Sequence, residues 1–149
     1  LSDMVKNKKA LSTDRAFFYA FKDKSLQAFA IELNTDEQLF NEGTDRYGNV
    51  IGQYGQYTEE INKGKTFGGK QKIAGENWFF LDSGDLFDSF YVKAVKDGLI
   101  IYATDVEKLA DVMGEDPSIL VGLTEENKAI LAHECLPRIR EYIVNTLLK

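Results

Sequence analysis

The chain has few of the residues from which metal sites and disulfides are built. Its 149 residues include one cysteine (Cys135), one histidine (His133) and two prolines. A single cysteine excludes an internal disulfide and suits a reducing compartment. A zinc site of the Cys/His type takes about four such ligands, and this chain has two such residues. We therefore expect no metal and no cofactor.

Long apolar runs are also missing. No stretch approaches the ~20 apolar residues that span a bilayer, and residues 1–10 are basic without the apolar segment of a secretory signal. The formal net charge of −6 argues against broad binding to nucleic acid, which needs many cations to neutralise phosphates. We expect no membrane partner, no broad coating of nucleic acid and no sequence-specific binding to it, and the net charge leaves room for a locally basic patch.

What the chain does contain is typical of one globular domain. Hydrophobic residues make up 44% and charged residues 28%, which argues against wholesale disorder. Its length fits a single domain over residues 1–149. Ser12 and Thr13 are suited to cap an N-terminal helix. Residues at helical spacing would form its apolar face, namely Phe17, Phe18, Phe21, Ala28 and Phe29.

A second, short helix is predicted after the first. Thr35 and Gln38 match a capping box at its start. Gly43 is placed to end it, and Asn34 indicates a bend between the two helices. The first part of the chain is therefore expected to be helical with one break.

Residues 43–75 are rich in glycine. We call this stretch, together with the next two residues (43–77), the arm. Eight of the twelve glycines lie there, and their backbone entropy opposes regular structure. A loop longer than ~12–15 residues is usually functional or disordered, and a solvated linker rarely carries many rings. We expect an arm that orders against a partner; the alternative is a hairpin packed on its own domain. The candidate interface residues are Tyr47, Tyr54, Tyr57, Thr58, Lys63 and Phe67, with one helical turn expected over residues 58–63.

Strand signals follow the arm. Residues 78–81 (WFFL) are expected to form a short buried strand. Residues 89–95 and 99–104 alternate between apolar and polar side chains, with Asp97-Gly98 between them. Asp-Gly is a preferred centre of the type I′ turn, so these two segments predict an antiparallel hairpin.

Helical signals return after the hairpin. Asp105 is expected to cap a helix that ends before Gly114. Thr124 is expected to cap the last helix, which Pro137 should kink or split. The predicted fold class is α+β: an antiparallel sheet flanked by N-terminal and C-terminal helices, with a long glycine-rich arm.

Sequence patterns for catalysis are incomplete. Gly64-Lys65-Thr66 ends like a phosphate loop, but position 59 is glutamate where that motif begins with glycine. His133-Glu134 begins like the helix of a zinc protease, but position 137 is proline. One histidine still permits a Ser-His-Asp triad, although no nucleophile-elbow sequence accompanies it. We therefore expect that the protein is not an enzyme.

The densest group of carboxylates is Asp82, Asp85 and Asp88. Their spacing of three lets them share one face of a helical turn and hold a hard cation. The alternative is that Asp82 or Ser83 caps this turn and Gly84 shapes it. We favour capping, which leaves a carboxylate- or metal-dependent hydrolase as the lesser alternative.

The stretch DRYGNVIGQYGQYTEEINKGK and the stretch ILVGLTEENKAIL resemble two segments of small neck and tail-completion proteins of tailed bacteriophages. The first is similar to a glycine-bearing segment of that family, and the second to the capped start of its C-terminal helix. LDSGDLFDSF resembles its Thr/Ser-Gly pair followed by a leucine and a Ser-hydrophobic pair. LNTDEQLF is most similar to versions from phages and prophages of Bacteroidetes. The matching residues are Ser83, Gly84, Leu86, Ser89, Phe90, Gly122 and Leu123.

The resemblance implies a non-enzymatic α+β subunit that assembles as a ring at the head–tail junction or the tail terminus. Its partners would be copies of itself and neighbouring connector and tail proteins. It would belong to a virion that is assembled in the cytoplasm of a bacterial host. The alternative is a free-standing small binding or immunity-type protein that presents the aromatic arm to one partner.

Overall fold

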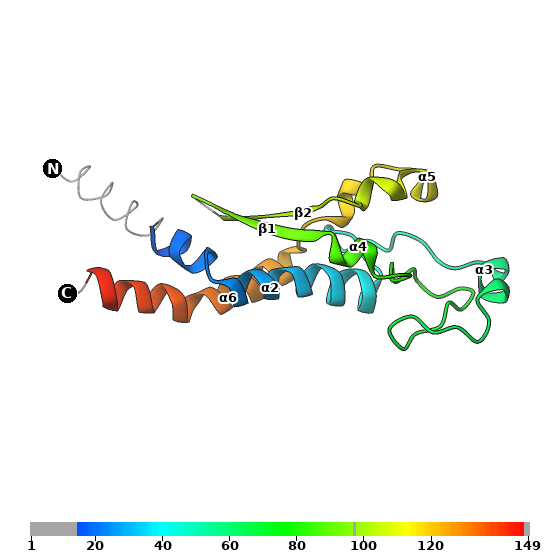
Figure 1. Cartoon of the computed structure of the whole chain (residues 1–149), viewed down its shortest axis with the longest axis horizontal. Helices are drawn as coiled ribbons and strands as arrows, with labels where there is room; N and C mark the ends of the chain where they lie inside the picture. The colour runs from blue at the N-terminus through cyan, green and yellow to red at the C-terminus, as the bar shows by residue number, and fades with distance from the viewer. Residues whose placement is uncertain (1–14, 97, 148–149) are drawn as a thin grey trace.

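The computed structural model (Figure 1) describes residues 15–96 and 98–147 and shows an elongated α+β fold. Helices from both ends of the chain lie at one end, the hairpin lies over them, and the arm forms the other end. After a helical segment at residues 15–21, the elements are α2 (Lys24–Glu32), π-helical η1 (Leu33–Glu42), α3 (Gln56–Ile61), α4 (Asp85–Asp88), β1 (Phe90–Val95), β2 (Gly98–Ala103), 3-10 helix η2 (Val106–Leu109), α5 (Ala110–Met113), 3-10 helix η3 (Pro117–Leu120), α6 (Glu125–Tyr142) and π-helical η4 (Ile143–Leu147).

The N-terminal helix is broken where the sequence predicted one continuous helix. The chain leaves the first helical segment at Lys22, and Asp23 begins α2 by accepting a hydrogen bond from the Leu26 N–H at 3.0 Å. Ala28, predicted on the apolar face, is exposed because the break resets the helical phase. The predicted cap at Ser12 and Thr13 lies outside the described residues.

Replacing Asp23 by alanine is expected to lower the free energy of unfolding by about 1 kcal/mol near neutral pH, because α2 loses its cap. Hydrogen bonds from Ser25 and from the Leu26 N–H hold the pKa of the Asp23 carboxyl below its ordinary value. This stabilisation is present above the unfolded pKa and is lost as the pH falls through the folded pKa. Urea unfolding at several pH values measures it. Glu32→Ala, at the other end of α2, is the control and should change stability by less than about 0.5 kcal/mol.

The helix continues from α2 into η1, so the predicted capping box is wrong. Thr35 lies inside the helix, where its hydroxyl donates to the Ile31 carbonyl at 2.9 Å. Asn34 produces no bend, since Leu33 follows α2 with helical backbone angles. Gly43 ends the helix as predicted, in the left-handed conformation with φ +67°.

Gly43→Ala is expected to lower the free energy of unfolding by more than about 2 kcal/mol. A left-handed φ costs a residue with a Cβ about 1–2 kcal/mol, and this Cβ would also lie 2.5 Å from the Trp78 carbonyl oxygen. Gly48→Ala is the matched control, because Gly48 has φ +84° but open space around it. Guanidinium unfolding should show a clearly smaller loss for the control. Equal losses would contradict the close packing of Gly43 on Trp78.

Two small hydrophobic clusters form the core. The first lies between the N-terminal segment, α2 and α6, and the second lies beneath the hairpin. Ile101 of β2 packs against both clusters, so the hairpin joins them. The buried members of the first are Ala20, Leu26, Ala30, Leu33, Leu123, Leu131 and Cys135, and those of the second are Leu39, Phe90, Val106 and Leu120.

The predicted hairpin is confirmed, with one difference at its turn. β1 and β2 pair antiparallel from Phe90 opposite Ala103 to Val95 opposite Gly98. Gly98 therefore belongs to β2, although the sequence predicted it in the centre of the turn. Asp97 itself lies outside the described residues.

The strand predicted at residues 78–81 does not form. Phe80 has a φ of +61°, which is incompatible with an extended strand and turns the chain. Residues 71–81 instead run irregularly, with one isolated bridge between Gln53 and Asn77.

The C-terminal helix begins as predicted and is not split. The Thr124 hydroxyl oxygen accepts a hydrogen bond from the Asn127 N–H at 3.1 Å. α6 then runs through Pro137 to Tyr142, and His133 lies exposed on it. Among the described residues, no helix is long and apolar enough to cross a membrane.

Candidate assembly surface

The arm packs around one buried ring. Phe79, only 4% exposed, has the rings of Phe40, Tyr54 and Phe67 around it at centroid distances of 5.6, 5.4 and 6.2 Å. We call these four residues the aromatic cluster. Two of them, Tyr54 and Phe67, were predicted to contact a partner, but here they are half-buried within their own chain. The cluster therefore fixes the arm to the end of η1.

Polar contacts reinforce the aromatic cluster. Lys70 Nζ lies 4.5 Å from the Phe40 ring centroid and donates to the Phe40 carbonyl. Lys72 Nζ lies 4.5 Å from the Phe67 centroid and forms an ion pair with Asp82. Cations over aromatic faces are attracted by the ring quadrupole. Both lysines therefore hold the arm in place.

The Tyr54 hydroxyl closes the aromatic cluster on its polar side. It accepts a hydrogen bond from the Phe79 N–H at 3.2 Å. Burial raises the pKa of this hydroxyl above its ordinary value, so it stays protonated at neutral pH.

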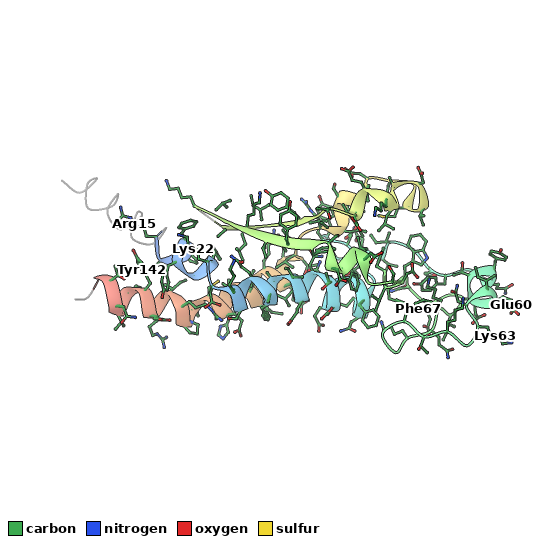
Figure 2. All side chains as sticks on the ribbon, in the orientation of Figure 1. Arg15, Lys22, Glu60, Lys63, Phe67 and Tyr142 are labelled. Carbon is green, nitrogen blue, oxygen red and sulfur yellow. The ribbon has the colours of Figure 1, made fainter. Side chains whose placement is uncertain are left out.

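The far end of the arm presents an exposed apolar face on α3. Tyr57 is 78% exposed and Ile61 is 54% exposed, and their spacing of four places them on one side of the helix. Glu60 lies beside them on the same side, and Figure 2 shows it at the end of the molecule. We call Tyr57, Glu60 and Ile61 the tip face. Of the other predicted interface residues, Thr58 is half-buried and Lys63 is exposed on the loop after α3.

Tyr47 lies at the other end of the arm, near its base. Its ring is 64% exposed, and the Arg46 guanidinium lies 5.0 Å from the ring centroid. The Asp45 carboxylate accepts hydrogen bonds from the Tyr47 and Asn49 N–H groups, which shapes this turn. Tyr47 is therefore exposed but lies apart from the tip face.

A groove of about 550 Å³ opens between β2 and α6. Its lining includes polar and charged side chains, which are Arg46, Tyr47, Glu125 and Lys128. Burial raises the pKa of the Cys135 thiol, which keeps it protonated and weakly reactive. We call this feature the groove, and its apolar lining includes Leu99, Ile101, Leu123, Leu131 and Cys135.

Four of the residues that carry the phage resemblance lie in α4 or beside its two ends. Gly84 precedes α4 with φ +93°. At the end of α4, the Ser89 hydroxyl donates to the Leu86 carbonyl at 2.6 Å and accepts from the Asp105 N–H at 3.2 Å. Phe90 is buried at the start of β1. These four residues therefore fix the entry into the hairpin.

Ser83, Gly84 and Leu86 also meet the arm. They line a second cavity of about 330 Å³ together with Tyr54 and Thr58. Gly122 and Leu123 lie apart from this cavity and line the groove. The structure therefore brings part of the resembling segments to the arm and part to the groove.

Two buried amide side chains hold residues 120–127, and the sequence did not indicate this role for either of them. Asn34 Nδ2 donates to the Leu120 carbonyl at 2.8 Å, and its Oδ1 accepts from the Gly122 N–H at 2.8 Å. Asn34 thereby satisfies backbone groups that no sheet partner satisfies. The available signal was the spacing of four between Asn34 and Gln38, which places both amides on one face of the helix.

Gln38 completes this amide network. Its Nε2 donates to the Gly122 carbonyl at 2.9 Å. Its Oε1 accepts from the Thr124 N–H at 2.9 Å and from Asn127 Nδ2 at 2.8 Å. Gln38 is fully buried, so this network holds the segment before α6 against η1.

The acidic residues of the 82–88 segment are dispersed. Asp82 pairs with Lys72, and the Ser83 hydroxyl accepts from the Asp85 N–H at 3.3 Å. Within residues 15–96 and 98–147, no three His, Cys, Asp or Glu side chains gather closely enough to hold a metal ion. The Ser83 hydroxyl therefore closes the turn before α4, but the predicted cap by Asp82 or Ser83 is wrong, because Gly84 is the N-cap of α4 and no side chain caps it.

Comparisons with protein-family models, with curated proteins and with solved structures found no match for this chain.

Proposed function

We propose that this chain is a structural subunit that assembles with copies of itself. The observation that carries the proposal is the tip face: two large apolar side chains are exposed at the end of an arm that is itself anchored. The aromatic cluster orders the arm before any partner binds, which reduces the entropy lost on association. An anchored arm with an exposed apolar end is suited to contact another molecule.

The resemblance to phage neck and tail-completion proteins indicates what kind of assembly we propose. The assembly would be a ring at the head–tail junction or tail terminus of a virion, built in the host cytoplasm and joined to connector and tail proteins. A ring forms when one surface of each subunit binds a different surface of the next and the rotation closes. The net charge of −6 suits a channel through which DNA passes without adhering.

The test is the molar mass of the purified chain in solution. Light scattering coupled to size-exclusion chromatography, over a wide range of protein concentration, should show a defined oligomer. Electron microscopy of the same fractions should show closed rings. A chain that stays monomeric at every concentration, alone and with connector and tail proteins from its own gene neighbourhood, would contradict the proposal.

A free-standing binding protein is the second candidate. The cavity of about 330 Å³ beside the arm favours it, because Trp78, Phe80 and Met113 line this cavity with the Lys72–Asp82 ion pair. Such mostly apolar cavities with few polar groups are typical of binding sites. A monomer that forms a one-to-one complex with an unrelated protein would support this candidate over the ring.

A further inference from the structure

Building on the proposed self-assembly, we propose that the tip face of one copy binds in the groove of a second copy. Tyr57 and Ile61 would enter the apolar hollow between β2 and α6, and Glu60 would face Arg46 at its edge. The occupant of the groove is thus a second copy of this chain.

The two surfaces are complementary in shape and polarity. The tip face is a protruding helix end with two exposed apolar side chains. The groove is a hollow of about 550 Å³ whose half-buried apolar lining includes Leu99, Ile101 and Val121. Burying apolar surface on both sides stabilises the contact by roughly 25 cal/mol per Å² before the costs of association.

The charges beside these surfaces are also complementary. Glu60 on the tip face and Arg46 at the groove form no ion pair within the described part of the chain. Glu125, the acidic residue of the groove lining, already pairs with Lys128 at 3.1 Å. Arg46 therefore remains as the cation for an incoming carboxylate.

The position of the two surfaces favours contact between copies. In Figure 1, α3 lies at the opposite end of the molecule from the start of β2, where the groove lies. The tip face is therefore separated from the groove of its own chain along the length of the molecule. A contact between two different surfaces of one chain propagates from copy to copy, and it gives a ring when the rotation closes.

The first test removes the apolar contact. The double variant Tyr57→Ala with Ile61→Ala should weaken self-association by about 30-fold or more, because central aromatic contacts contribute most of the binding energy. Both side chains are exposed, so the fold should be kept, which circular dichroism checks. Val112→Ala is the matched control, since Val112 is 68% exposed on α5 and should leave association unchanged.

The second test reverses the charges. Glu60→Arg and Arg46→Glu should each weaken association by roughly tenfold, because each sets like charges opposite one another. Combining both changes in one chain should restore association, since the pair is then rebuilt with the signs exchanged. Glu115→Arg, an exposed site outside both surfaces, is the control and should have no such effect.

The outcomes separate this inference from the proposed function. If the natural chain assembles but the tip and charge variants assemble equally well, the tip-to-groove contact is wrong and self-assembly stands. If the natural chain never assembles, both are wrong. A small apolar molecule that co-purifies with the natural chain and with the tip variant, seen in the groove by native mass spectrometry and NMR, would also overturn the inference.

Discussion

Replacing Gln38 by alanine is expected to lower the free energy of unfolding by roughly 3–5 kcal/mol. The change removes three hydrogen bonds of a fully buried side chain, one of them buried and two part-buried, and leaves the Gly122 carbonyl, the Thr124 N–H and the Asn127 amide without their partner. Each buried polar group that loses its partner costs about 1–3 kcal/mol. Guanidinium unfolding measures the loss.

Glu37→Ala is the control for this change. Glu37 is the preceding residue in η1, and its exposed side chain accepts a hydrogen bond from Asn41. Its loss should alter stability by less than about 0.5 kcal/mol. A loss below about 1 kcal/mol for Gln38→Ala would show that the amide network does not hold residues 120–127 in place.

Phe79→Ala is expected to destabilise the chain by about 3–5 kcal/mol, as removal of a large core side chain does. The rings of Phe40, Tyr54 and Phe67 all lose the partner around which they pack. The arm should loosen first, so limited proteolysis should cut within residues 43–77 well before the rest of the chain. Unfolding and proteolysis together measure the effect.

Tyr57→Ala is the control for the aromatic cluster. It removes a ring of the same arm that is 78% exposed, so stability and protease resistance should stay close to those of the natural chain. If Phe79→Ala leaves the arm as resistant as this control does, the aromatic cluster does not anchor it.

Features that depend on neighbouring residues were predicted well. The hairpin, the left-handed glycine ends at Gly43 and Gly114, and the Thr124 cap all follow from local chemistry and are confirmed. The predicted arm also contains a short helix, although at Gln56–Ile61 instead of residues 58–63. Local rules act within a few residues, so one sequence suffices for them.

Features that depend on distant residues were predicted wrongly. Thr35 and Gln38 have the spacing of a capping box, yet Gln38 bonds to residues 84 to 89 positions away. Residues 78–81 have strand-like composition, yet the chain turns at Phe80 with its φ of +61°. In both places, tertiary contacts outweigh local preference.

The candidate assembly surface was likewise predicted only where it depends on local sequence. The concentration of rings in the arm could be recognised from the sequence. Which rings pack inward could not, because Tyr54 and Phe67 are half-buried through Phe79, a residue outside the arm. The groove was missed entirely, since its lining comes from several separated segments.

Hydrogen exchange at low and high protein concentration tests the central claim most directly. On assembly, backbone amides of α3 at the tip and of β2 and α6 at the groove should exchange more slowly, while α5 stays unchanged. If concentration changes the exchange of neither surface, or protects only regions outside both, the tip of the arm does not hold copies of this chain together.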